Sequence, residues 1–162
     1  MLNNELLLDL FLQSAREAMA ERPQIGVTNR HEWATVGRMG VWLGRKPEIL
    51  GLEKQGIFLD IEYGQMISDD MKSTGDGDVR IDMILHRRGT NDANLLACEV
   101  KMSPAKARKV DRKDDAKLRV LTTEKFGYGL CIWIRLPRCF TDRHTGRYAI
   151  YSNGRAGPLL DL

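Results

Sequence analysis

VRIDMILH, at residues 79–86, largely alternates apolar with polar side chains, which is the period of a β-strand with two different faces. A second stretch, LLACEVKM at residues 95–102, is apolar except for Glu99 and Lys101, which is typical of a strand inside a sheet. A polar turn at 88–94 separates the two stretches. The sequence therefore predicts a β-hairpin whose second strand carries two charged side chains.

The rest of the chain supplies helices and further strands around this hairpin. Apolar residues recur at helical spacing in three segments, and alternation or short apolar runs indicate three more strands. The helix before the fourth strand is long enough for a crossover, so strands three and four are expected to be parallel and the first three antiparallel. The predicted helices span 5–21, 29–43 and 111–123, and the added strands span 57–63, 127–136 and 147–151.

These elements predict an α/β fold in the order α-α-β-β-β-α-β-β, with a mixed central β-sheet flanked by helices. A length of 162 residues is typical of one domain. We expect a single domain over 1–162, with an N-terminal packing helix in 1–24, a core over 29–136, and a C-terminal strand and tail over 137–162.

Composition excludes several classes of protein. The hydrophobic fraction of 43% and the charged fraction of 29% are those of a globular domain. Residues 1–5 contain no base, and no stretch approaches the roughly 18 apolar residues of a membrane span. We therefore expect a cytoplasmic protein with no membrane partner. The three cysteines, Cys98, Cys131 and Cys139, lack metal-type spacing and are expected to be reduced.

The two charged residues of the third strand indicate chemistry. Positions two apart share a strand face, so Glu99 and Lys101 emerge side by side, and the hairpin brings Asp82 to the same place. Two neighbouring carboxylates repel each other unless a cation lies between them. Mg²⁺ fits this need because it takes one or two protein carboxylates and leaves its other positions to water and phosphate. The alternative is a buried ion pair between Lys101 and a carboxylate.

The segments RID (80–82) and EVK (99–101) together resemble the motif of the PD-(D/E)XK, or restriction endonuclease-like, nuclease superfamily. A longer resemblance over 32–136 is to a group of uncharacterised bacterial proteins within that superfamily. Its pattern is seen here as DIEY (60–63), RIDMILHRRG (80–89), NLL (94–96), EVK (99–101), Asp114 and KL (117–118). The resemblance implies a restriction endonuclease-like core.

The resemblance also implies roles for four residues. Asp82 and Glu99 would be ligands of Mg²⁺ or Mn²⁺, and the backbone carbonyl of Val100 would be a third ligand. Lys101 would orient or help to deprotonate the attacking water and stabilise the charge that develops on the phosphorane.

Four further residues are candidates for an auxiliary part in this site, and each has an ordinary alternative. Glu32 resembles the helix glutamate that many family members add, but it also fits a capping box at the start of its own helix. Glu62 would reach the metal through water or be an exposed acid. His86 would contact phosphate or be a structural histidine. Lys117 would point toward the site or form a surface pair with Asp114.

A basic segment follows the third strand. Residues 101–119 contain eight bases and three acids, an excess that attracts polyanions. A solvated helix face is the alternative interpretation. The candidates for contact with a nucleic-acid backbone are Lys106, Arg108, Lys109, Arg112 and Lys113.

These observations lead to three hypotheses for function. The first is a Mg²⁺- or Mn²⁺-dependent nuclease acting on nucleic acid, with DNA expected. The second is a catalytically inactive module of the same fold that binds nucleic acid or a protein partner. The third is a structural subunit of a larger assembly. Fold alone does not choose among them, but metal binding at Asp82 and Glu99 separates the first two. Many related nucleases act as dimers, so the resemblance is compatible with a homodimer.

Overall fold

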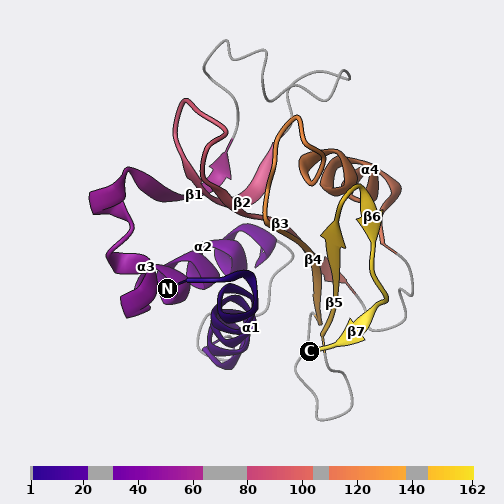
Figure 1. Ribbon diagram of the computed structural model, residues 1–162. Helices are drawn as coiled ribbons and strands as arrows, with labels where there is room; N and C mark the ends of the chain where they lie inside the picture. Colours follow the sequence, from indigo (N-terminus) through magenta and orange to yellow (C-terminus); the bar gives the residue numbers. More distant parts are fainter. Residues whose placement is uncertain (1, 22–30, 64–79, 104–109, 138–145) are drawn as a thin grey trace.

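The computed structural model describes residues 2–21, 31–63, 80–103, 110–137 and 146–162. These residues form a seven-stranded mixed sheet in the order β1-β2-β3-β4-β5-β6, with β7 paired to β5 (Figure 1). The strands are β1 (Ile57–Tyr63), β2 (Ile81–Arg87), β3 (Asn94–Ser103), β4 (Leu130–Pro137), β5 (Arg147–Ser152), β6 (Arg155–Ala156) and β7 (Leu160–Asp161). The helices are α1 (Asn4–Ala20), α2 (His31–Gly44), α3 (Pro47–Leu50), the 3-10 helix η2 (Glu53–Gln55) and α4 (Arg112–Leu121).

The strand directions are those predicted from the sequence. Strands β1, β2 and β3 form an antiparallel meander, whereas β3 and β4 are parallel. Helix α4 lies between β3 and β4 in the chain and makes the crossover. The predicted α/β architecture with a mixed sheet flanked by helices is therefore confirmed.

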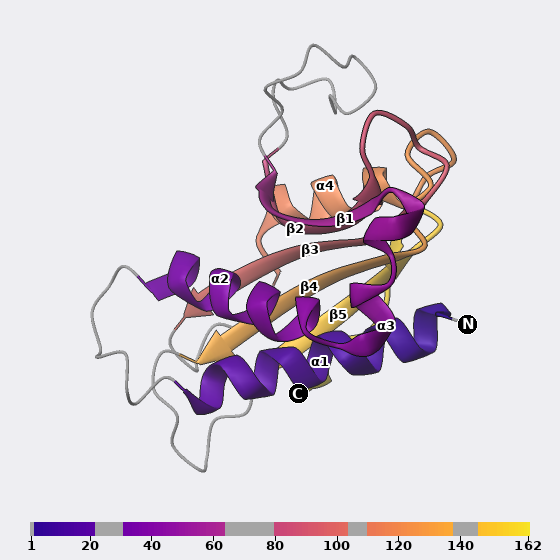
Figure 2. The same ribbon diagram turned by 90° about the vertical axis from the view of Figure 1, so that its left-hand side faces the viewer.

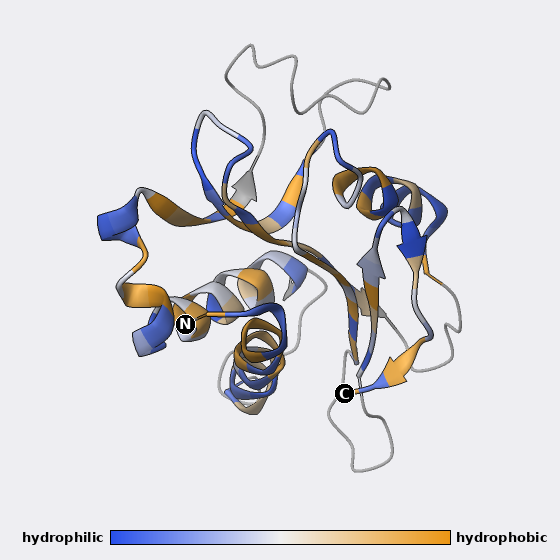
Figure 3. Cartoon of the chain, in the orientation of Figure 1, coloured by the Kyte–Doolittle hydropathy of each residue, from blue (hydrophilic) through white to orange (hydrophobic). Residues whose placement is uncertain are grey.

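Helices cover both faces of the sheet, with α1, α2 and α3 on one side and α4 on the other (Figures 1 and 2). Strand β4 shows how the sequence divides between the two faces. Leu130 and Ile132 belong to the core under α1 and α2, whereas Cys131 and Trp133 belong to the core under α4. Figure 3 shows apolar residues along the strands of the sheet. Cys98 and Cys131 are buried free thiols, as predicted, and Cys139 lies outside the described residues.

Helix α1, with 17 residues, is the longest helix that the structure describes. It begins at the N-cap Asn3, whose side chain accepts a hydrogen bond from the Leu6 amide at 2.8 Å. Its buried stripe includes Leu7 and Phe11, so its role is packing. Within the described part of the chain, no helix is long and apolar enough to cross a membrane.

Helix α2 packs closely against β1 at one glycine. A Cβ atom added at Gly40 would lie 2.3 Å from Cδ1 of Ile61, so only glycine fits there without a shift of that side chain. A Cβ atom at Gly37 would meet nothing within 4 Å. Helix α2 is therefore closely packed at Gly40 and has open space at Gly37.

Four short elements were not predicted from the sequence: α3, η2, β6 and β7. None of them is longer than four residues. Segments of that length do not complete enough turns or alternations to show a period.

Candidate active site

Glu99 and Lys101 lie on the face of β3 that α4 covers. Strand positions alternate between faces, and Ala97, two residues earlier, belongs to the core under α4. Glu99 and Lys101 also lie toward the carboxyl end of β3, which runs parallel to β4. The carboxyl ends of parallel strands are the usual location of binding sites in open α/β sheets.

Asp82 occupies the place where β2 and β3 separate. The β2–β3 ladder ends at the pair Met83 and Cys98. Beyond it, the Val100 amide donates a hydrogen bond of 2.7 Å to Oδ2 of Asp82. Because the N–H and C=O groups of one extended residue point to the same side, the Val100 carbonyl faces Asp82 as well. The register extended by one residue sets Asp82 opposite Glu99.

Glu99 is buried and bound to a lysine of α4. Its Oε1 accepts a hydrogen bond of 2.6 Å from Nζ of Lys117, which also donates to the Arg80 carbonyl at 2.6 Å. Burial raises the pKa of Glu99 to about 8, the negative charge of Asp82 adds to the rise, and Lys117 opposes it. Burial also raises the pKa of Asp82, although the bond from Val100 opposes this. Burial is therefore the main cause of both raised pKa values.

Lys101 is surrounded by carboxylates. Its Nζ lies 3.6 Å from Oδ2 of Asp114 and 3.8 Å from Oε1 of Glu32. Burial by itself lowers the pKa of Lys101, but the negative charges of Asp114, Glu32, Asp82 and Glu99 outweigh it and raise that pKa above its ordinary value. Lys101 is thus a permanent cation at neutral pH, with a side chain that remains one-third exposed.

Glu32 reaches this cluster from α2, on the other side of the sheet. Its Oε2 accepts a hydrogen bond of 2.9 Å from the Met102 amide of β3. The carboxylate therefore points to the end of β3. Asn29, the other member of the proposed capping box, lies outside the described residues.

Asp114 is a member of the cluster that sequence reasoning missed. It is 5% exposed, and its Oδ2 accepts a hydrogen bond of 3.3 Å from Nε1 of Trp133. The sequence left Lys117 two alternatives, the site or a surface pair with Asp114. The structure has the first, because Lys117 contacts Glu99, whereas Asp114 contacts Trp133 and Lys101. The one available signal was the place of Asp114 in the longer family pattern.

Two other candidates, His86 and Glu62, have no described contact with the charged cluster. His86 is fully buried with its Nε2 3.0 Å from Oδ2 of Asp60. A register shift separates it from Leu85, and it lies toward the end of β2 away from Asp82. It is thus held in a structural pair rather than aimed at a phosphate site. Glu62 lies opposite Asp82 in the β1–β2 register, and its side chain is outside the described part of the structure.

The basic candidates are only partly described. Arg112 and Lys113 are exposed in the first turn of α4, which Asp111 caps by accepting a hydrogen bond from the Lys113 amide. Lys106, Arg108 and Lys109 lie outside the described residues. The described part of the basic segment therefore begins beside the cluster, at the start of the helix that supplies Asp114 and Lys117.

The charge balance of the cluster favours a divalent cation. Its contacts involve four carboxyl groups (Glu32, Asp82, Glu99 and Asp114) and two ammonium groups (Lys101 and Lys117), so with all four carboxyl groups ionised it would be two positive charges short. Among the described residues, no three His, Cys, Asp or Glu side chains are grouped to hold a metal by themselves. Mg²⁺ needs only one or two protein carboxylates, so two carboxylates and a backbone carbonyl suit it chemically.

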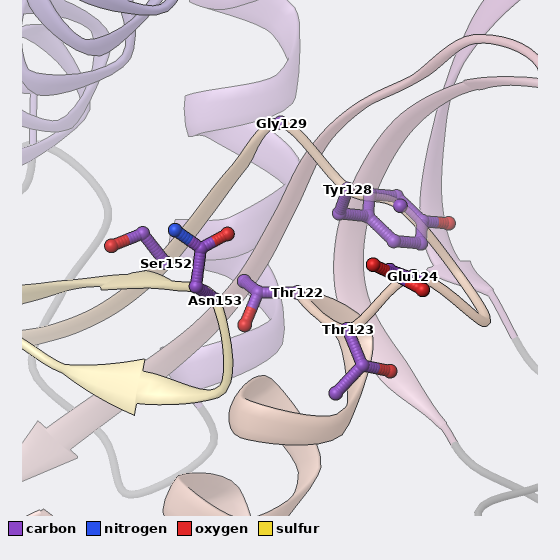
Figure 4. Close-up of a pocket in the computed structure, with 8 residues that line it drawn as sticks. Thr122, Thr123, Glu124, Tyr128, Gly129, Ser152 and Asn153 are labelled. Atoms are coloured by element: carbon purple, nitrogen blue, oxygen red, sulfur yellow. The ribbon is translucent and has the colours of Figure 1, made fainter.

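A separate pocket of about 610 Å³ lies at the other end of α4 (Figure 4). Its lining includes Thr122, Tyr128 and Asn153, which come from the end of α4, the approach to β4 and the turn after β5. No residue of the charged cluster lines it. The pocket is therefore distinct from the candidate site.

Comparison with models of known protein families and with curated protein sequences gives no match to this chain. The arrangement of the cluster is therefore the main ground for assigning a function. Hard oxygen donors, the half-buried Asp82, the buried Glu99 and the Lys101 cation, gathered at the edge of the sheet where β2 begins and β3 ends, can hold a divalent ion and a phosphate group.

Proposed function

We propose that this protein is a divalent-metal-dependent nuclease that hydrolyses phosphodiester bonds in nucleic acid, with DNA as the expected substrate. The core would be restriction endonuclease-like, of the PD-(D/E)XK type. The observation that carries the proposal is the gathering of Asp82, Glu99 and Lys101 at one end of the sheet, in a cluster of four carboxyl groups and two ammonium groups. The parallel pair β3 and β4, joined through α4, supports the proposal.

Asp82, Glu99 and the Val100 carbonyl would hold Mg²⁺ or Mn²⁺. When bound, such an ion polarises a phosphoryl oxygen and makes water a better nucleophile at neutral pH. Lys117 is a positioning residue in this scheme, because it fixes one oxygen of Glu99 and ties it to the Arg80 carbonyl. Glu99 would then present its second oxygen to the ion.

Lys101 would act as a cation. In the metal-free protein the neighbouring carboxylates raise the pKa of Lys101, which favours its protonated form. Its ammonium group can instead orient the attacking water and stabilise the charge that develops on the phosphorane. Glu32 and Asp114 restrict the position of that ammonium group from two sides.

Metal binding is the first test. Calorimetric titration with Mn²⁺ or Mg²⁺ should detect binding to the wild-type protein and none to Asp82→Asn or Glu99→Gln, because each variant removes a ligand. Lys101→Ala should keep the metal. Asp92→Asn, which changes an exposed acid in the turn before β3, serves as the control. If both ligand variants bind the ion like wild type, the metal site lies elsewhere.

Cleavage is the second test. Protein purified without metal is offered single-stranded, duplex and branched DNA, and RNA, and each ion is then added. We expect cleavage with Mg²⁺ or Mn²⁺ and a loss of about 10²- to 10³-fold in rate for Lys101→Ala, because one charge contact with the transition state is lost. Lys54→Ala, at an exposed lysine of η2, is the matched control.

Calcium separates binding from chemistry in the same assay. Its larger and looser coordination shell should support substrate binding with little turnover. If wild type cuts no substrate with any ion while nucleic acid still binds, the protein is the inactive binding module.

A further inference from the structure

Trp33 is exposed beside the candidate site. It lies in the first turn of α2 and is 61% exposed. The other two tryptophans are placed differently, since Trp133 is fully buried and Trp42 packs against the core. Tryptophan offers a large apolar surface, and its exposure in a folded protein is a frequent sign of an interaction site.

Arg80 lies over this ring. The guanidinium carbon of Arg80 is 4.8 Å from the centroid of the Trp33 ring, within the range of a cation–π interaction. Arg80 comes directly before β2, two residues ahead of Asp82. The pair therefore combines an exposed aromatic ring with a cation.

Both members of the pair are tied to the cluster. Trp33 follows Glu32, whose carboxylate is bonded to the Met102 amide of β3. The carbonyl of Arg80 accepts the hydrogen bond of Lys117, which also holds Glu99. The ring is thus at the rim of the site, one residue along the chain from a member of the charged cluster.

We propose that Trp33 and Arg80 form a stacking site for one unpaired nucleobase next to the scissile phosphate. The inference rests on the proposed function, because that site is what brings a phosphodiester to the ring. Every base has a π-face that can stack on an aromatic side chain, and an arginine beside the ring adds attraction to the phosphate backbone.

The substrate class follows from this geometry. In a duplex each base is stacked between its neighbours, so its face is not available to a protein ring. A single strand, or the single-stranded part of a branched or frayed duplex, offers free base faces. The preferred substrate is therefore nucleic acid that is unpaired at the position of cleavage.

Binding measurements without metal test this inference independently of turnover. Fluorescence anisotropy with a labelled oligothymidine in EDTA compares wild type with Trp33→Leu, which keeps an apolar side chain but lacks a ring, and with Trp33→Phe, which keeps a ring. Stacking of one base is worth about 5- to 150-fold in affinity. We expect Trp33→Leu to lose this factor for single strands and little for duplex, and Trp33→Phe to retain most of it. Leu50→Ala, at a leucine that is also 61% exposed, should bind like wild type.

A series of oligonucleotides with one abasic position provides a second measurement. In one member of the series, the missing base is the one that would stack on Trp33. Wild type should bind this member as weakly as Trp33→Leu binds the intact strand. Trp33→Leu should bind this member and the intact strand with equal affinity. A general loss of structure in the variant would instead weaken all members alike and would not be restored by Trp33→Phe.

The outcomes separate the two proposals. Equal affinity of Trp33→Leu and wild type for single strands, or an equal loss for single strands and duplex, overturns the stacking site even if metal-dependent cleavage is found. A selective loss for single strands in a protein that cuts nothing upholds the stacking site and overturns the nuclease. If wild type binds no oligonucleotide either in EDTA or with Ca²⁺, both proposals are wrong.

Discussion

At the residue scale, the pairing of charges differs from the simplest expectation. Glu99 and Lys101 are neighbours on one strand face, yet Glu99 pairs with Lys117. Side chains two apart in a strand emerge about 7 Å from each other and run parallel. A lysine on the helix above can instead approach a buried carboxylate end-on. Lys101 pairs instead with Asp114 and Glu32, and its own side chain is partly exposed.

The raised pKa of Glu99 predicts a pH dependence of stability in the metal-free protein. Between the ordinary pKa of a glutamate and about 8, the folded state binds more protons than the unfolded state, so stability falls as pH rises. One pKa unit corresponds to about 1.4 kcal/mol. We expect the free energy of unfolding by urea in EDTA to fall by about 1–3 kcal/mol between pH 5 and pH 8, and the Glu99→Gln variant to show less of this fall.

Glu53→Gln, at an exposed glutamate of η2, should behave like wild type in these unfolding experiments. Mg²⁺ should restore stability to wild type at pH 8 and not to Glu99→Gln. A Glu99→Gln protein that is much less stable than wild type at every pH would instead indicate that the pair with Lys117 is a structural ion pair.

Sequence reasoning placed Asp82, Glu99 and Lys101 together because strand alternation and hairpin pairing are local rules. It left two alternative roles open for Glu32 and for Lys117, and it did not predict that Asp114 belongs to the site. The direction of a helical side chain relative to a strand depends on how the helix packs, and that packing is decided by the whole core. The residues on strands were therefore predictable as a group, and those on helices were not.

At the element scale, the start of β2 is the feature on which the site depends. The sequence predicts the hairpin but not the residue at which its ladder stops, because both strands continue in sequence beyond that point. In the structure, the Asp82 side chain accepts the hydrogen bond of the Val100 amide, which would bond to the backbone of β2 in a longer ladder. The end of the ladder is thus what brings together the oxygen atoms of the proposed metal site.

The two glycines of α2 allow a matched test of packing. Alanine in place of a helical glycine stabilises by about 0.5–1 kcal/mol where there is room for the methyl group. We expect that gain for Gly37→Ala, since nothing lies within 4 Å of the added Cβ atom. Gly40→Ala should gain less or lose stability, because the methyl group displaces the side chain of Ile61.

Urea unfolding of both glycine variants beside wild type measures the difference. The substitutions share the same helix and the same change of residue, so helix propensity cancels between them. A Gly40→Ala protein at least as stable as Gly37→Ala would mean that Ile61 moves away without cost and that α2 is not closely packed on β1.

At the scale of the whole molecule, the mixed sheet was predictable because its main strands are seven or more residues long except for β5. The crossover helix then fixed the direction of β4. The short pieces α3, η2, β6 and β7 were not predictable, since their conformation depends on the body against which they lie. The packing of α1 and α2 on one face and α4 on the other divides the core in two.

The distribution of charge predicts how nucleic acid binds. The net charge is only +3, and the candidate site itself is acidic, so attraction must come from bases near it. Neutralising Lys106, Lys109 and Lys113 together with glutamine should weaken binding to all sequences alike. It should also flatten the dependence of log affinity on log salt by about 0.9 per lost phosphate contact on duplex, or about 0.7 on a single strand. The exposed lysine of η2 gives the control Lys54→Gln, which should keep the wild-type slope. An unchanged slope in the triple variant would place the nucleic-acid surface on another face, because counterion release counts phosphate contacts directly.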